Sequence, residues 1–294
     1  MTLAINSARL SLTLDTLASI SEAAPPAVTR VVFGDADRRA RAYVTTLCRE
    51  AGLEVREDAV GNTFARLRGT APDLPPVGTG SHIDAIPNAG MFDGTVGVLG
   101  GLEAIRALTA AGIRPSRSID LIVFTAEEPT RFVIGCLGSR LLSGALGDEA
   151  GDCLTDADGR TLNEVRAQAG FQGTLGSVRL PADACHAFVE LHIEQGPLLE
   201  RAGLDIGIVT AIAAPAGLTI AIEGEGGHAG AVLMPDRRDA FLAAAEIALA
   251  VEEAARGTGA IDTVATVGVC DLFPGAVNSV PSAARLQVDV RDIN

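Results

Sequence analysis

Apolar segments that predict buried strands alternate with segments of helical spacing over the first two thirds of the chain. Val77–His82, Ser118–Phe124 and Ala187–Ile193 predict strands that are covered on both faces of a sheet. Thr95–Ala111 has the spacing of a helix that ends at Gly112. This alternation predicts an α/β fold with a mostly parallel sheet flanked by helices.

The pattern changes after about Ile212, where a second, smaller α+β unit is predicted. Its elements are one strand, one long helix and two further strands, at Gly217–Glu223, Asp236–Ala255, Val264–Asp271 and Ala283–Arg291. We therefore expect two domains, residues 1–212 and residues 213–294.

Three predicted strand ends carry side chains of types that bind metal ions. The carboxyl ends of parallel strands converge at one edge of a sheet, so we expect these side chains to share a cleft. Mixed histidine and carboxylate donors suit Zn²⁺, Mn²⁺ or Co²⁺, and a bridging aspartate is the usual feature of a two-metal hydrolytic site. The candidates are His82 with Asp84 and Asp93, Glu127 with Glu128, and His192.

The spacing within these groups suggests roles for two of the carboxylates. His82 and Asp84 point to the same side of a strand, so Asp84 would fix the tautomer of a metal-binding His82. Glu127 and Glu128 point in opposite directions, so one would bind metal and the other would act as a general base. The plainer alternatives are a core histidine beside a capping aspartate, and a solvated helix N-terminus ahead of Pro129.

Other candidates lie outside these strand ends. His228 sits in a glycine-rich loop, where it would donate to a developing oxyanion or be only a turn residue. Arg291 would hold a substrate carboxylate, although a surface arginine is the commoner case. The five cysteines form no CxxC pair and fit reduced thiols, mostly in the core. Cys136 is the one near a candidate site, and a catalytic nucleophile there is the disfavoured alternative.

Charge, composition and the distribution of apolar residues argue against nucleic acid and membranes as binding partners. A formal charge of −14 and 3% aromatic residues oppose binding to nucleic acid. The N-terminal segment lacks a basic region followed by a long apolar run, so we expect no signal peptide and a cytoplasmic protein. The longest uncharged run, Ile206–Ile222, contains Pro215 and Gly217 and predicts two strands joined by a turn, with no membrane span.

At these residues the sequence resembles the dinuclear-metal amidohydrolases that include N-carbamoyl-L-amino-acid hydrolases, β-ureidopropionase, and allantoate and ureidoglycolate amidohydrolases, which are relatives of the aminoacylase and carboxypeptidase superfamily. The shared motifs occur in family order over nearly the whole chain. They are GSHIDAIPNAGMFDGTVGVLGGLEAIRAL, FTAEEPTRFVIGCLGSRLLSG, HIEQGPLLE, GGHAGAVLMPDRRDA and NSVPSAARLQVDVRDI. Gly230–Met234 departs from the carbamoylase motif GHAGTTPM, and this favours the ureidoglycolate and allantoate branch.

The resemblance implies a fold, a cofactor and a role for each residue. The first domain would be a metal-dependent exopeptidase-like catalytic domain, and the second a mobile lid that forms a homodimer. Two divalent ions, Zn²⁺, Mn²⁺ or Co²⁺, would lie in the first domain, with Asp84 outside their direct ligands. The implied ligands are His82, Asp93, Glu128 and His192, with Asp93 bridging; the general base is Glu127; the substrate-binding residues are Gln195, His228, Asn278 and Arg291, with His228 reaching the partner subunit's site.

The implied reaction is hydrolysis of a linear C–N bond in a ureido or N-carbamoyl carboxylate by metal-bound hydroxide. The resemblance also implies a longer chain, because family members continue beyond the residue matching Asn294 and supply a last histidine ligand there. We therefore expect a C-terminally truncated chain with an incomplete lid and second metal site. Two alternatives stay open: a dipeptidase or aminoacylase on the same fold, and an inactive relative that binds a ligand or dimerises.

Overall fold

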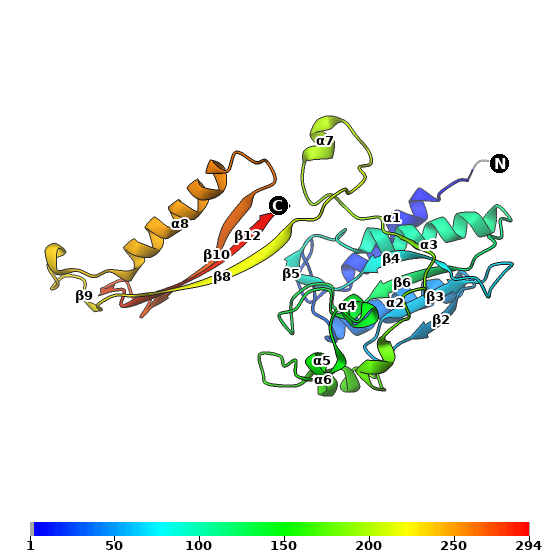
Figure 1. Ribbon diagram of the computed structural model, residues 1–294, viewed down its shortest axis with the longest axis horizontal. Coiled ribbons are helices and arrows are strands. Elements are labelled where there is room, and N and C mark those ends of the chain that lie inside the picture. Colours follow the sequence, from blue (N-terminus) through cyan, green and yellow to red (C-terminus); the bar gives the residue numbers. More distant parts are fainter. Residues whose placement is uncertain (1–2, 294) are drawn as a thin grey trace. The chain divides into compact units, whose positions relative to one another are not determined.

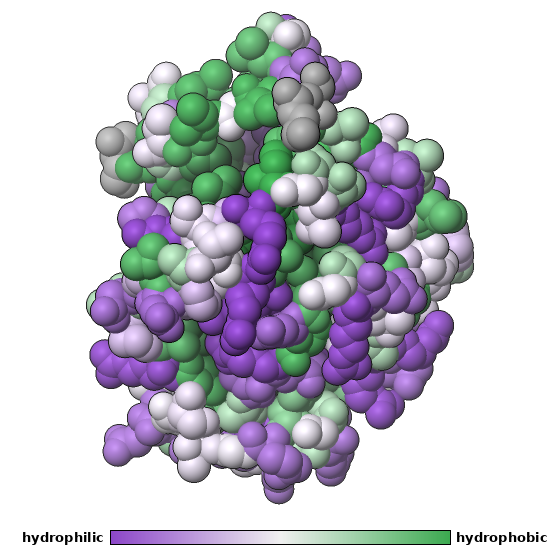
Figure 2. Space-filling view, turned by 90° about the vertical axis from the view of Figure 1, so that its right-hand side faces the viewer, coloured by the Kyte–Doolittle hydropathy of each residue, from purple (hydrophilic) through white to green (hydrophobic). Residues whose placement is uncertain are grey.

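The computed structural model describes residues 3–293, which divide into two compact units. The first unit runs to Arg201 and the second begins at Ala202 (Figure 1). None of the described helices combines the length and the apolar character that crossing a membrane would need. One face of the molecule shows hydrophilic side chains interspersed with smaller hydrophobic areas (Figure 2).

A five-stranded sheet forms the centre of the first unit. Its strands lie in the order β2-β3-β6-β4-β7. Strands β6, β4 and β7 are parallel, whereas β2 and β3 form an antiparallel hairpin that is also antiparallel to β6. The α/β class is therefore confirmed, with a mixed sheet. The strand bounds are β2 Glu54–Glu57, β3 Thr63–Leu67, β4 Val77–His82, β6 Ile119–Phe124 and β7 Ala187–Val189.

Helices and loops cover both faces of this sheet. Leu121 and Ile122 are consecutive in β6, so they point to opposite faces, and each belongs to a different apolar core. Leu121 packs with residues of three long helices, and Ile122 packs with shorter helices and a loop. The long helices are α1 Ser7–Ser19, α2 Asp35–Glu50 and α3 Thr95–Ala110; the shorter ones are α4 Leu137–Ser143, α5 Asp148–Asp152, α6 Leu162–Gln168 and the 3-10 helix η1 Leu175–Val178.

The remaining elements of the first unit are small. Strands β1, Val28–Arg30, and β5, Ala85–Ala89, form an antiparallel pair beside the sheet. Helix α7, Leu198–Ala202, is a short exposed helix at the boundary between the units. The prediction of a buried strand over 187–193 is wrong, because β7 ends at Val189 and that side chain is 65% exposed. Within the described part of the chain β7 pairs with β4 alone, so one of its edges stays uncovered.

The second unit is a three-stranded antiparallel sheet with one helix packed on it. The strands lie in the order β10-β12-β8, and buried Ala240 and Ala244 of the helix pack on Leu286 of the central strand. A two-stranded pair, β9 with β11, lies beside this sheet. The bounds are β8 Ala214–Glu223, β9 Gly227–His228, the 3-10 helix η2 Met234–Asp236, α8 Ala240–Gly257, β10 Val264–Phe273, β11 Ser279–Val280 and β12 Ala283–Asp292.

Two details of the second unit differ from the sequence prediction. The run Ile206–Ile222 does not form two strands: it contains most of the single strand β8, which tolerates Pro215 because β8 lies at the edge of its sheet. Helix α8 starts at Ala240 and not at Asp236, because the Asp239 side chain caps it by accepting the Phe241 N–H at 2.9 Å.

Candidate metal centre

Two histidines at the ends of parallel strands present the same ring nitrogen to one aspartate. His82 ends β4 and is buried, with its Nδ1 3.0 Å from the carbonyl oxygen of Asp84. His192 follows β7, with its Nδ1 2.9 Å from the carbonyl oxygen of Ile193. A carbonyl only accepts, so Nδ1 carries the proton in each ring and Nε2 keeps a free lone pair. Both Nε2 atoms lie near Oδ1 of Asp93.

The distances between these three atoms fit a divalent ion. Oδ1 of Asp93 is 3.3 Å from Nε2 of His192 and 3.8 Å from Nε2 of His82, and all three atoms lie within 4.8 Å of one another. Ligands about 2.1 Å from a tetrahedral ion lie about 3.4 Å apart. In addition, Oδ1 of Asp93 is buried and receives no hydrogen bond from any described residue. We call His82, Asp93 and His192 the candidate metal centre.

The Asp84 carboxylate ties the end of β4 to the loop that follows β6. Its Oδ1 accepts the Glu127 N–H at 3.2 Å and its Oδ2 accepts the Glu128 N–H at 3.0 Å. Ala126, just before the pair, has a left-handed backbone with φ 50°. Asp84 thus uses two different groups. Its backbone carbonyl oxygen contacts His82 Nδ1, while its carboxylate, whose Oδ1 is 3.7 Å from that nitrogen, binds the N–H groups of the two glutamates.

Glu127 and Glu128 lie beside the candidate metal centre in different ways. Oε2 of Glu127 is 3.7 Å from Nε2 of His82, and its side chain is 38% exposed. Glu128 is not part of the three-residue group, but the nearby charges of Glu127 and Asp93 act on it. Of the four predicted metal ligands, the structure therefore groups three and places the fourth next to them.

Negative charge accumulates here beyond what the histidines balance. Burial raises the pKa of Glu128 to about 7, and the charges of Glu127 and Asp93 add to the rise. Burial also raises the pKa of Asp84 to about 6. Burial, the largest single influence on His82, opposes its charged form, but Asp84, Glu127 and Asp93 together outweigh it and raise the pKa of the ring. A bound cation would relieve this repulsion, as expected for a metal site.

Gly94 allows the start of α3 to approach His82 closely. Its φ is 64°, a left-handed conformation that favours glycine. A Cβ atom at this position would lie 2.5 Å from Nε2 and Cδ2 of the His82 ring. Asp93 therefore reaches the histidine because the residue after it has no side chain. The Asp93-Gly94 pair in the sequence was the available sign of such a turn.

The predicted substrate-binding residues fall in both units. Gln195 is an exposed residue of the first unit with a left-handed backbone, φ 57°. In the second unit, His228 pairs with Ser279 across β9 and β11, and the Asn278 carbonyl accepts the Ala229 N–H at 2.9 Å. His228 and Asn278 are therefore neighbours in the fold although fifty residues separate them along the chain.

Arg291 is not brought to these two residues within the second unit. It lies near the end of β12, paired with Pro215, whereas Ala283 at the start of β12 pairs with Glu223. The length of extended strand between Ala283 and Arg291 is about 25 Å, and β9 lies at the opposite end of the sheet from the chain's C-terminus (Figure 1). Nε of Arg291 is 2.8 Å from Oδ2 of Asp289, and both side chains are exposed.

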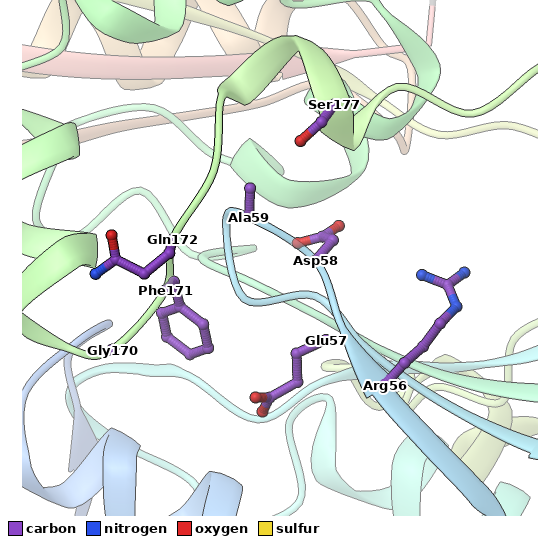
Figure 3. A pocket seen from close by; sticks show the side chains of 8 residues that line it. All are labelled: Arg56, Glu57, Asp58, Ala59, Gly170, Phe171, Gln172 and Ser177. Atoms are coloured by element: carbon purple, nitrogen blue, oxygen red, sulfur yellow. The ribbon is translucent and has the colours of Figure 1, made fainter.

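A separate hollow on the first unit involves none of the predicted site residues. It has a volume of about 470 Å³ and is lined by residues of β2, the following turn and the segment after α6, among them Arg56, Asp58 and Phe171 (Figure 3). The Asp58 carboxylate already accepts N–H groups of Val60 and Asn62. Because the hollow contains none of the grouped histidines and carboxylates, the candidate metal centre is the better functional site.

The sequence pattern did not reveal one contact at the centre. Sγ of Cys136 lies 3.3 Å from Oε1 of Glu127. Cys136 has a left-handed backbone, φ 57°, at the start of α4, and no motif spacing predicts that this thiol turns back to Glu127.

Comparison with known proteins shows the family to which the chain belongs. The model of peptidase family M20/M25/M40 matches residues 78–277. The chain is 54% identical over 300 residues to a ureidoglycolate hydrolase of Arabidopsis thaliana, and 45% identical over 271 residues to an N-carbamoyl-L-amino acid amidohydrolase of Geobacillus stearothermophilus. These matches cover 99% and 90% of the chain, and 63% and 64% of the relatives.

Solved structures show the same relationship. The crystal structure of AtUAH in complex with glyoxylate matches with a TM-score of 0.90 at 53% identity, covering 99% of this chain and 70% of that one. A hydantoinase/carbamoylase family amidase from Burkholderia multivorans matches with a TM-score of 0.83 at 36% identity, covering 99% of this chain and 70% of that one. The chain spans 63% and 61% of the lengths of two plant ureidoglycolate hydrolases.

Proposed function

Because the chain belongs to peptidase family M20/M25/M40, which is metal-dependent, we propose that it is an amidohydrolase that cleaves the linear C–N bond of a ureido carboxylate. The observation that carries this proposal is the convergence of His82 and His192, at the ends of parallel strands, with Asp93 in the turn before α3 and Glu127 beside them. Among ureido carboxylates we propose ureidoglycolate, because two relatives that are 54% and 52% identical over 99% of the chain are ureidoglycolate hydrolases.

The donor set suits two divalent ions of intermediate hardness, Zn²⁺, Mn²⁺ or Co²⁺. His82, Asp93, His192 and Glu128 would hold them, and the buried Oδ1 of Asp93, which receives no hydrogen bond from any described residue, is a donor that lies near both histidines. Bound ions of this kind supply an acidified water, with its pKa lowered towards ~7. The first unit would thus be the catalytic domain, and the second a lid that also forms a dimer.

The chain's own residues would then move the proton and hold the substrate. Oε2 of Glu127 faces the centre, so it would take the proton of the attacking water and deliver it to the leaving nitrogen. His228 would donate to the carbonyl oxygen as negative charge develops on it. Arg291 and Asn278 would hold the substrate carboxylate, with Gln195 at the edge of the site.

The separation of residues in the second unit supports a shared site in a homodimer. His228 and Asn278 lie together, while Arg291 lies about 25 Å of strand away. One small substrate cannot contact all three within a single second unit. In a twofold dimer, His228 and Asn278 of one subunit would complete the site that contains Arg291 of the other subunit.

Product analysis tests the reaction and separates it from its rivals. With Mn²⁺ or Zn²⁺ present, we expect ammonia from ureidoglycolate, and slower release from allantoate and N-carbamoyl amino acids. A dipeptidase or aminoacylase would release free amino acids from dipeptides or N-acyl amino acids and no ammonia from ureidoglycolate. Ammonia production that is equal with and without a chelator would contradict the metal-dependent reaction.

Mixed dimers test the shared site. In the shared site, one subunit supplies Glu127 and its partner supplies His228. A homodimer of Glu127→Gln or of His228→Ala therefore has no intact site and is expected to be inactive. Co-expression of the two with different affinity tags should restore about a quarter of wild-type activity, because half of the dimers are mixed and one of their two sites is intact.

The matched control combines Glu127→Gln with Asp93→Ala, both of which lie in the first unit. That mixture should stay inactive, because no pairing of subunits gives an intact site. Recovery in the control pair, or none in the test pair, would refute sharing of His228 between subunits.

A further inference from the structure

The two carboxylate oxygens of Glu127 face different partners. Oε2 is 3.7 Å from Nε2 of His82, on the side of the candidate metal centre. Oε1 is 3.3 Å from Sγ of Cys136, a distance that fits a hydrogen bond donated by the thiol. The contact with Cys136 therefore holds the Glu127 carboxylate in an orientation in which one oxygen meets the thiol and the other faces the centre.

The backbone holds Cys136 in place against Glu127. The Cys136 N–H donates to the Glu127 carbonyl at 2.6 Å, and the next two N–H groups, of Leu137 and Gly138, donate to Ala126 and Thr125 at 2.9 and 2.8 Å. Three successive bonds thus pair residues 136–138 with residues 125–127. The left-handed conformation of Cys136, with φ 57° and ψ 31°, turns its side chain within this ladder.

The thiol remains a donor at neutral pH. Burial raises the pKa of Cys136 to about 11, and the charge of Glu127 adds to the rise. A reactive cysteine requires the opposite, a pKa lowered by positive neighbours. The alternative of Cys136 as a nucleophile is thereby disfavoured.

We propose that Cys136 is a positioning residue for Glu127: its S–H group donates to Oε1 and keeps Oε2 directed at the candidate metal centre. The catalytic part of this inference rests on the proposed function, in which Glu127 is the general base. The contact itself is independent of any reaction.

The S–H stretching vibration tests the contact without any activity. The infrared band of Cys136 is isolated as the difference between the wild-type chain and Cys136→Ala, because the other four thiols cancel. A hydrogen bond to a carboxylate lowers the wavenumber of this band. We expect it to rise in Glu127→Ala, measured as the difference between Glu127→Ala and the Glu127→Ala/Cys136→Ala double variant. A band at the same wavenumber with and without Glu127 would overturn the proposal.

Kinetics test the consequence. Cys136→Ala is expected to lower kcat about 3- to 10-fold, the effect of one lost hydrogen bond, with KM within about twofold. Cys136→Ser, which keeps a donor, should recover most of the loss, and Cys153→Ala, at an exposed thiol just after α5, should leave kcat unchanged. Equal kcat in the Ala variant and the wild type, or an equal loss in the Ala and Ser variants, would refute positioning. A chain that hydrolyses no ureide would refute the proposed function and leave the infrared result standing.

Discussion

Replacing Glu127 with Gln is expected to lower kcat for ammonia release by about 10²- to 10⁴-fold, the range for loss of a general acid–base group. Gln has nearly the same shape, so its amide still occupies the space between Cys136 and the His82 ring. It cannot take a proton, however. Because Glu127 is not part of the three-residue metal group, the bound metal per chain should stay the same.

Steady-state kinetics together with elemental analysis measure both halves of this prediction. The control is Glu149→Gln, an exposed glutamate on α5 that should change neither value. Wild-type kcat in Glu127→Gln with metal bound would show that the proton is taken by another group. A parallel loss of metal and of activity would make Glu127 a ligand instead of a base.

Replacing Asp93 with Ala is expected to weaken metal binding by more than about 100-fold, since even partners outside the direct ligands are worth 10- to 100-fold. The Asp93 Oδ1 lies between the Nε2 atoms of His82 and His192 and has no other described partner. Its removal leaves two neutral nitrogens and takes away the negative charge nearest to the ion. Activity should fall with occupancy.

Calorimetric titration of Mn²⁺ or Zn²⁺ into the metal-free chain measures this affinity. Asp73→Ala, at an exposed aspartate in the loop before β4, is the matched control and should bind as the wild type does. Equal affinities of Asp93→Ala and the wild type would place the ion elsewhere. Thermal unfolding without metal should show that Asp93→Ala is still folded, because the substitution relieves repulsion with Glu128.

The position of the site could be predicted from the sequence because it follows from a general property of parallel strands. Residues after β4, β6 and β7 are far apart along the chain, but parallel pairing of β6, β4 and β7 places them at one edge. Residue type then suggested a metal site, since mixed histidine and carboxylate donors suit divalent ions. The fold class followed in the same way from alternation of strands and helices.

The contacts between side chains could not be predicted in this way. Spacing predicted that the Asp84 carboxylate would fix the His82 ring, whereas the backbone carbonyl of Asp84 does so and the carboxylate holds the N–H groups of Glu127 and Glu128. That division depends on how the loop after β6 returns to β4. The turn of Cys136 towards Glu127 likewise depends on the left-handed backbone conformation of Cys136, which cysteines rarely adopt.

Errors in the second half of the chain had a different cause. Apolar character over 187–193 and 206–222 predicted buried or paired strands, but apolar residues are buried only where another element covers them. Strand β7 ends at Val189, and β8 is a single strand that begins at Ala214. His228 and Arg291 lie at opposite ends of the second unit because of the register in which its strands pair. Composition holds no information about this register.

The central claim is that the ends of β4 and β7, together with the turn before α3, form a metal centre. Anomalous diffraction at the zinc edge from crystals of the chain soaked in Zn²⁺ measures this directly. A peak within about 2.0–2.2 Å of Nε2 of His82, Nε2 of His192 and Oδ1 of Asp93 is the predicted result. Zinc peaks only at other positions, with these three atoms bare, would contradict the metal centre and the reaction proposed from it.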